Sequence, residues 1–329
     1  MTEVATDRQS LCEAIRSGDR GALARTITLL ESTRSEHLVE GQSVLELLVP
    51  HSGAATRVGV TGPPGVGKSS LIETLGLQLA EAGRRVAVLA VDPSSPVTGG
   101  SILGDKTRME RLARHPNAFI RPSPSGGSLG GVAERTREGM LACEAAGFEI
   151  VLIETVGIGQ SEVTVAGMVD FFLVLLQPGS GDELQAIKKG VLELADGLLV
   201  NKSDGELVNA AERTRVEFAR ALHLVRPRSD SWTPRVVAAS ALTGEGVEAL
   251  WELVEEQQAC LQASGEAERR RRQQARAWMW SLIEDGLGRR FREDPGVAAR
   301  IPELEAEVEA SRITPAGAAR LLLDLFQPG

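Results

Sequence analysis

The segment Gly62-Pro63-Pro64-Gly65-Val66-Gly67-Lys68-Ser69 has the spacing of a phosphate-binding loop, and it constrains the fold more than any other feature of the chain. Such a loop requires a β-strand before it and a helix after it. The flanks meet this requirement, because an apolar run of β type covers 57–61 and an amphipathic helical stretch covers 70–77. We therefore expect a P-loop nucleotide-binding domain of the α/β class.

Each part of this loop has an expected chemical task. Its glycines let the backbone wrap around phosphate groups, and the amides at the following helix N-terminus face the anion. We expect Lys68 to reach the terminal phosphates and the Ser69 hydroxyl to bind Mg²⁺. The nucleotide-binding residues expected here are Gly62, Pro63, Pro64, Gly65, Val66, Gly67, Lys68, Ser69 and Ser70.

Two downstream motifs indicate that the base is guanine. Asn201-Lys202-Ser203-Asp204 follows a predicted strand, and Ser240-Ala241-Leu242 follows the next one. The Asp204 carboxylate can accept two hydrogen bonds from guanine nitrogens, a donor pair that adenine lacks. Asn201 is expected to bond the other edge of the base and tether the loops, the Lys202 stem to cover the ring, and Ser240, Ala241 and Leu242 to cap the base oxygen.

Alternation of strand and helix signals predicts a doubly wound, mostly parallel sheet covered on both faces. We predict a helical N-terminal extension over 1–52, broken at Gly18 and Gly41, a GTPase domain over 53–264 and a helical arm over 265–329. The predicted strands are 57–61, 86–91, 118–120, 150–153, 171–176, 197–200 and 236–239, and the predicted C-terminal helices are 247–261, 267–287, 297–310 and 315–326.

Composition argues against several classes of partner. Lys and Arg total 36 against 45 Asp and Glu, so a net charge of −9 gives no sign of nucleic-acid or anionic-membrane binding. The run Arg269 to Arg272 lies among acidic residues and is interpreted as a solvated helical face. Cys12, Cys143 and Cys260 are scattered, which favours a reducing compartment, and no segment resembles a membrane span or a secretory signal. We expect a cytoplasmic protein.

Three segments between these motifs are candidates for catalytic and switch roles. Asp92 follows a strand and Asp105 follows a Gly-rich stretch, so either carboxylate could bind Mg²⁺ or water. Glu154 and Gly157 lie where most GTPases have Asp-x-x-Gly, and direct or water-bridged metal binding by Glu154 both stay open. The third segment, 177–189, contains Gln185 and Lys188. The catalytic set is then Lys68, Asp92, Asp105, Glu154, Gln185 and Lys188, with Ser69, Asp92, Asp105 and Glu154 as metal candidates.

A glutamine directly after Gly157 is missing, because Ile158 stands there and Gln160 comes later. Many GTPases use such a glutamine to position water. We therefore expect slow intrinsic hydrolysis and completion of the site by a partner or a second subunit.

The segments 91–96, 99–109 and 154–162, with 177–189, resemble the MeaB/ArgK-type GTPase chaperones of adenosylcobalamin-dependent methylmalonyl-CoA mutase, and the MeaB members most of all. The resemblance covers about 5–325. It implies a fold similar to nickel-insertion and signal-recognition GTPases, binding of GTP or GDP with Mg²⁺, and a homodimer formed through the C-terminal helical arm. It also implies that GTP binding and hydrolysis control cofactor loading and protect the mutase.

The sequence itself also indicates which protein binds the cobalamin, independently of the resemblance. No Asp-x-His-x-x-Gly motif surrounds any of the four histidines, so the cobalamin is expected to belong to the partner. Two alternatives stay open at this point. A P-loop kinase would need a substrate pocket and a catalytic base, and a metal-delivery GTPase would call for clustered Cys or His residues.

Overall fold

The computed structural model describes residues 2–91, 109–122, 129–155, 161–179 and 189–326. These residues fall into two compact units, Met1–Arg271 and Arg272–Gly329. The first unit contains the sheet and every nucleotide motif that the structure describes, and the second unit is helical.

The sheet of the first unit has seven strands, all parallel, in the order β3-β2-β4-β1-β5-β6-β7. Strand β1 is central, and the chain adds strands first on one side of it and then on the other. This confirms the expected doubly wound fold. The strands are β1 Thr56–Thr61, β2 Val86–Val91, β3 Ala118–Arg121, β4 Ile150–Thr155, β5 Phe171–Leu176, β6 Gly197–Val200 and β7 Arg235–Ala238.

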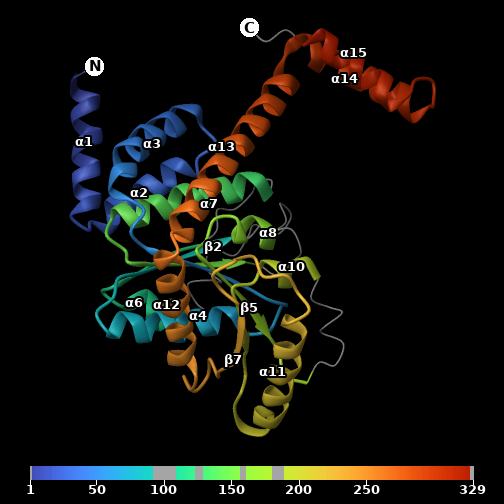
Figure 1. Cartoon of the computed structure of the whole chain (residues 1–329). Helices are drawn as coiled ribbons and strands as arrows, with labels where there is room; N and C mark the ends of the chain where they lie inside the picture. The colour runs from blue at the N-terminus through green and yellow to red at the C-terminus, as the bar shows by residue number, and fades with distance from the viewer. Residues whose placement is uncertain (1, 92–108, 123–128, 156–160, 180–188, 327–329) are drawn as a thin grey trace. The chain divides into compact units, whose positions relative to one another are not determined.

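Helices connect these strands and extend both ends of the chain (Figure 1). None of the described helices is long and apolar enough to cross a bilayer. The helices are α1 Thr2–Arg16, α2 Arg20–Leu30, α3 Ser35–Leu48, η1 Val49–His51, α4 Lys68–Glu81, α6 Glu110–Arg114, α7 Leu129–Ala145, α8 Ser161–Ala166, α10 Lys189–Leu194, η2 Gly205–Leu207, α11 Val208–Leu222, α12 Val247–Ala263, α13 Glu266–Glu293, α14 Pro295–Glu309 and α15 Pro315–Leu325.

Two apolar cores lie on the two faces of the sheet, because successive strand side chains point to opposite faces. On one face, Val58 and Val60 of β1 pack with residues of α4, α6 and α12. On the other face, residues such as Phe172 of β5 pack with the helices from α1 to α3, with α7 and with α11. The sheet is therefore covered on both faces, which explains why its central strands are mostly apolar.

The N-terminal helices pack on α7, and one predicted break within them is wrong. Gly18 does follow the end of a helix, since it has φ +91° two positions after Arg16, the last residue of α1. Gly41 instead lies buried in the middle of α3. A Cβ there would come within 3.1 Å of the Leu30 amide nitrogen of α2, so this glycine allows the two helices to approach closely.

A buried carboxyl group joins these helices to the sheet domain and gives a pH prediction. Glu138 of α7 accepts a hydrogen bond from Gln42 of α3 and is 4% exposed. Burial raises the pKa of Glu138 from 4.5 to about 7. The folded protein thus holds a proton that the unfolded chain releases across this window. Stability is therefore expected to fall as the pH rises from 4.5 to 7, by at most about 3 kcal/mol.

The variant Glu138→Gln removes the titrating group and keeps its size. We expect it to lose most of this pH dependence and to be more stable than the parent protein at pH 8. Urea unfolding of both proteins at pH 5 and pH 8 measures the difference. The same fall in unfolding free energy for both proteins would contradict the assignment to Glu138.

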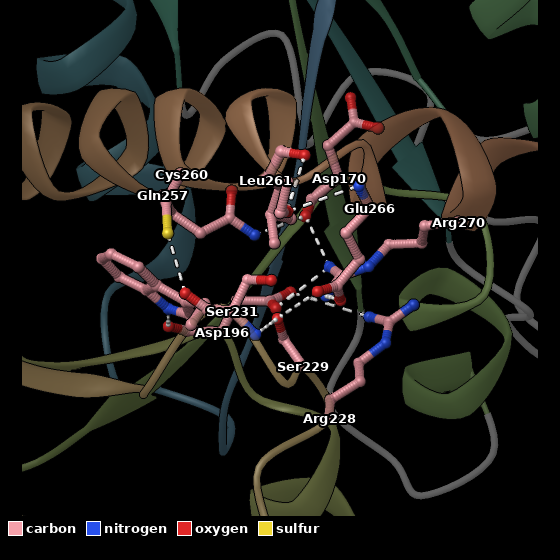
Figure 2. A network of polar contacts seen from close by, with 12 residues as sticks. Asp170, Asp196, Arg228, Ser229, Ser231, Gln257, Cys260, Leu261, Glu266 and Arg270 are labelled. Atoms are coloured by element: carbon pink, nitrogen blue, oxygen red, sulfur yellow. Dashed lines mark hydrogen bonds and ion pairs between the residues drawn. The ribbon is translucent and has the colours of Figure 1, made fainter.

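A buried network of charges lies at the amino edge of the sheet, opposite the ends that carry the nucleotide motifs (Figure 2). Asp196, which directly precedes β6, accepts hydrogen bonds from the Phe172 amide at 2.9 Å and from Arg270 Nη1 at 3.0 Å. Arg228 Nη1 lies 3.6 Å from the same carboxylate. Asp170, which directly precedes β5, accepts from Arg271 Nε at 2.8 Å and from the Arg57 amide.

These contacts correct the interpretation of the Arg269 to Arg272 run as a solvated face. Arg270 is 7% exposed. Arg271 also donates to the carbonyl oxygens of Gly53 and Ala55. Only Arg269 and Arg272 of the run are exposed. The first turns of α13 are therefore part of the first unit and are fixed to β1, β5 and β6.

Candidate functional site

The P-loop lies at the carboxyl edge of the sheet, where open α/β sheets bind ligands. Residues 62–67 connect the end of β1 to the first turn of α4, which begins at Lys68. Ser69 and the exposed Ser70 follow in the same turn. Strand β1 lies between β4 and β5. Strand β4 carries Glu154, and β5 ends directly before the 177–189 segment. The loop therefore lies at the carboxyl ends of the strands, at the point where the strand order reverses.

Asn201 ties the P-loop to the two base-recognition segments. Its Nδ2 donates to the Val66 carbonyl oxygen at 2.8 Å, and its Oδ1 accepts from the Ala241 amide at 3.0 Å. Gly67, at the N-cap of α4, has φ +98°, and a Cβ there would meet Asn201 Nδ2 at 2.5 Å. A glycine is thus required at this position, because of the left-handed backbone conformation and because a Cβ would displace the Asn201 side chain.

Two charged or hydroxyl side chains of α4 make contacts on the phosphate side. Lys68 Nζ donates to the carbonyl oxygens of Gly62 at 2.8 Å and Pro63 at 3.1 Å, so the ammonium group lies over the loop. The Ser69 hydroxyl donates to Glu154 Oε1 of β4 at 2.7 Å. The structure therefore brings the Glu154 carboxylate to the first turn of α4.

The base-side residues are also brought together. The Ser240 hydroxyl donates to Asp204 Oδ1 at 2.6 Å and orients that carboxylate. Lys202 has φ +59°, and its Nζ donates to the Gly65 carbonyl oxygen at 2.8 Å, which stretches its stem from the base segment to the P-loop. Leu242 is 86% exposed beside the buried Ala241.

One residue that positions this site was missed by sequence reasoning. Thr74, in the second turn of α4, donates its hydroxyl to the Ala241 carbonyl oxygen at 2.6 Å. The peptide groups of Ala241 are thus held by Asn201 through the amide and by Thr74 through the carbonyl. A half-buried threonine in an amphipathic helix gives no signal of this contact, because its partner lies 167 positions away.

The other expected site residues lie outside the described part of the chain. These residues are Asp92, Asp105, Gly157, Gln185 and Lys188. Among the described residues, no group of three or more His, Cys, Asp or Glu side chains is arranged to hold a metal ion.

Comparison with known proteins relates the chain to one family. The family model described as methylmalonyl-CoA mutase-associated GTPase MeaB matches residues 23–296. This range contains the P-loop, Glu154 and both base-recognition segments. The whole of α1 and the whole of α15 lie outside it.

Individual relatives span nearly the whole chain. The mitochondrial methylmalonic aciduria type A homolog of Mus musculus is 45% identical over 99% of this chain and 82% of its own. GTPase ArgK of Escherichia coli K12 is 47% identical over 87% of this chain and 86% of its own. A crystal structure described as LAO/AO transport system kinase has 35% identity and a TM-score of 0.79, covering 98% of both chains.

Proposed function

Because the chain belongs to the MeaB family of methylmalonyl-CoA mutase-associated GTPases and is thus a GTP-hydrolysing enzyme, we propose that it is a nucleotide-dependent chaperone of an adenosylcobalamin-dependent methylmalonyl-CoA mutase. The family resemblance drawn from the motifs is confirmed by these matches. In the proposed cycle, GTP binding and hydrolysis control loading of the cofactor onto the mutase and protect the mutase from inactivation.

The contacts of Asn201 are the observation that best supports control by a guanine nucleotide. One amide side chain joins the P-loop at Val66 to the base segment at Ala241. In our proposal the Asp204 carboxylate, oriented by Ser240, binds the guanine nitrogens, and Lys202 covers the ring. Binding of the base and of the phosphates would then be coupled mechanically through Asn201.

The phosphate side fits a bound Mg²⁺. The Ser69 hydroxyl and the Glu154 carboxylate are oxygen ligands 2.7 Å apart, and Mg²⁺ prefers oxygen ligands together with water and substrate phosphates. The ion would supply neutralisation of the charge that develops on the phosphates. We propose that Ser69 and Glu154 hold it directly or through water, that Asp92 and Asp105 contribute, and that Lys68 moves from its loop carbonyls to the phosphates. Gly157, Gln185 and Lys188 are proposed to sense the γ-phosphate and the partner.

A homodimer formed by the helical second unit is also proposed. Three large apolar side chains of α13 recur at helical spacing and are exposed: Trp280 by 51%, Ile283 by 39% and Leu287 by 52%. Helix α15 exposes Leu321, Leu323 and Leu325 in the same unit. Exposed apolar surface of this kind favours an interface, with Trp280 as its aromatic anchor.

The partner is tested by GTP turnover with and without saturating mutase. We expect the mutase to accelerate hydrolysis, and Lys188→Ala to lower the stimulated rate by about tenfold while leaving GTP affinity within about twofold. Lys189→Ala, the same charge change one position later, is the control and should respond like the parent protein. No acceleration in any of the three proteins would contradict partner activation.

Co-purification from native extract separates the alternatives. Recovery of a cobalamin-dependent mutase is the expected result. Recovery of a nickel enzyme such as a hydrogenase would instead favour a metal-delivery GTPase, and transfer of phosphate to an organic acceptor rather than to water would favour a kinase.

A further inference from the structure

Thr61 and Thr155 form a buried pair of hydroxyl groups between the two strands that lead into the phosphate site. The Thr155 hydroxyl donates to the Thr61 hydroxyl oxygen at 2.8 Å and lies 3.4 Å from the Val60 carbonyl oxygen. Thr61 is 0% exposed and Thr155 is 1% exposed. Buried hydroxyl groups need hydrogen-bond partners, and here each threonine is the partner of the other.

The two threonines are the last residues of the strands that lead into two candidate functional segments. Thr61 is the last residue of β1 and precedes the P-loop residue Gly62. Thr155 is the last residue of β4 and lies two positions before Gly157. Strands β1 and β4 are neighbours, with Val60 opposite Glu154. The hydroxyl bond therefore fixes the distance between the origins of the P-loop and of the 154–157 segment.

A second tether holds β4 from the opposite face of the sheet. Consecutive strand residues point to opposite faces, so Glu154 and Thr155 do so here. Glu154 points to the face covered by α4 and accepts from Ser69 at 2.7 Å. Thr155 points to the other face and bonds Thr61. The end of β4 is thus fixed to the P-loop on both faces, and only the Glu154 contact involves a candidate metal ligand.

We propose that Thr61 and Thr155 are a positioning pair for GTP hydrolysis, which rests on the proposed role of Gly157 at the γ-phosphate. Their bond holds the end of β4, at Glu154 and Thr155, at the distance from the P-loop that the γ-phosphate and its attacking water require. GDP has no γ-phosphate, and in the proposed site it contacts the P-loop and the base segments alone. Loss of the bond therefore slows turnover without weakening GDP binding, because misplacement at the reacting centre affects the chemical step.

The test compares Thr155→Val, which removes the hydroxyl at constant size, with Thr155→Ser, which keeps it. We expect Thr155→Val to lower kcat for GTP by about tenfold and to keep the Kd for GDP within about twofold. Thr155→Ser should restore kcat to within about twofold of the parent value. Thr26→Val, in the buried part of α2, is the control for replacing a buried threonine and should leave kcat unchanged.

A second variant keeps the proposal testable if Thr155→Val does not fold. The double variant Thr61→Val with Thr155→Val replaces both hydroxyls by methyl groups and leaves neither one unpartnered. It should fold, bind GDP and turn over GTP as slowly as Thr155→Val. Full kcat in either folded variant, equal slowing by Thr155→Ser, parallel loss of GDP affinity, or unfolding of both valine variants would each overturn the proposal. Absence of GTP turnover in the parent protein would instead be a failure of the proposed function.

Discussion

Replacing Asp204 by asparagine is expected to weaken GTP binding by about 2–4 kcal/mol, or roughly thirtyfold to nearly a thousandfold in Kd. Asn can still accept the hydrogen bond that the Ser240 hydroxyl donates to Asp204 Oδ1. The segment therefore keeps its shape, and the amide group of the new side chain faces the guanine nitrogens. The two guanine N–H donors then face the N–H donors of the new amide, and the charged carboxylate acceptor is lost.

Xanthosine triphosphate separates this cause from general damage, because it presents a carbonyl group at that edge of the base. Isothermal calorimetry should show partial recovery of affinity for the xanthine nucleotide in Asp204→Asn. The control is Asp230→Asn, the same change at an exposed position, which should leave both affinities unchanged. A variant that still prefers GTP would remove Asp204 from base recognition.

The sheet could be predicted from sequence because its signals are local. Each buried parallel strand is a short apolar run, and all seven predicted runs overlap strands of the structure. The break predicted at Gly41 was wrong for the opposite reason. Glycine weakens a helix in isolation, but here the close approach of α2 to α3 requires a residue without a Cβ.

The motif residues of the candidate site could also be found from sequence, because each motif is contiguous. The hydrogen bonds that hold these motifs in place could not be found in this way. Thr74 contacts Ala241 and Thr61 contacts Thr155 across long stretches of chain, and no periodicity marks either contact. Sequence patterns indicate which elements form, whereas pairings between the ends of different elements depend on strand order and register.

The arginine run is a second case in which long-range contacts could not be predicted from sequence, and here the contacts have a larger effect on stability. Arg269 to Arg272 have one chemistry and one local setting, yet Arg270 is buried between Asp196 and the Asp170 carbonyl oxygen (Figure 2). Charge composition cannot reveal this, because the two acidic residues come from the starts of β5 and β6. Burial of charge is tolerated here since each carboxylate has at least one arginine and a backbone amide as partners.

Arg270→Ala is therefore expected to destabilise the protein by about 3–5 kcal/mol, because it leaves the Asp196 carboxylate buried with one ion-pair partner fewer. Arg269→Ala makes the same change at the adjacent exposed position and should cost less than about 0.5 kcal/mol. Urea unfolding of the two variants and the parent protein measures both values. Equal stability of the two variants would show that the network contributes nothing.

The same contacts determine where the helical arm can be removed. A chain ending at Ser264 lacks Glu266, Arg270 and Arg271, so Asp170 and Asp196 lose their arginine partners from α13. We expect this chain to be unfolded or insoluble. A chain ending at Ala275 keeps those partners, and should be folded, bind GTP and, if the removed helices form the dimer, be monomeric by light scattering. A dimer of the chain ending at Ala275 would contradict dimerisation through the arm, whereas equal folding of both shortened chains would contradict the anchoring of α13.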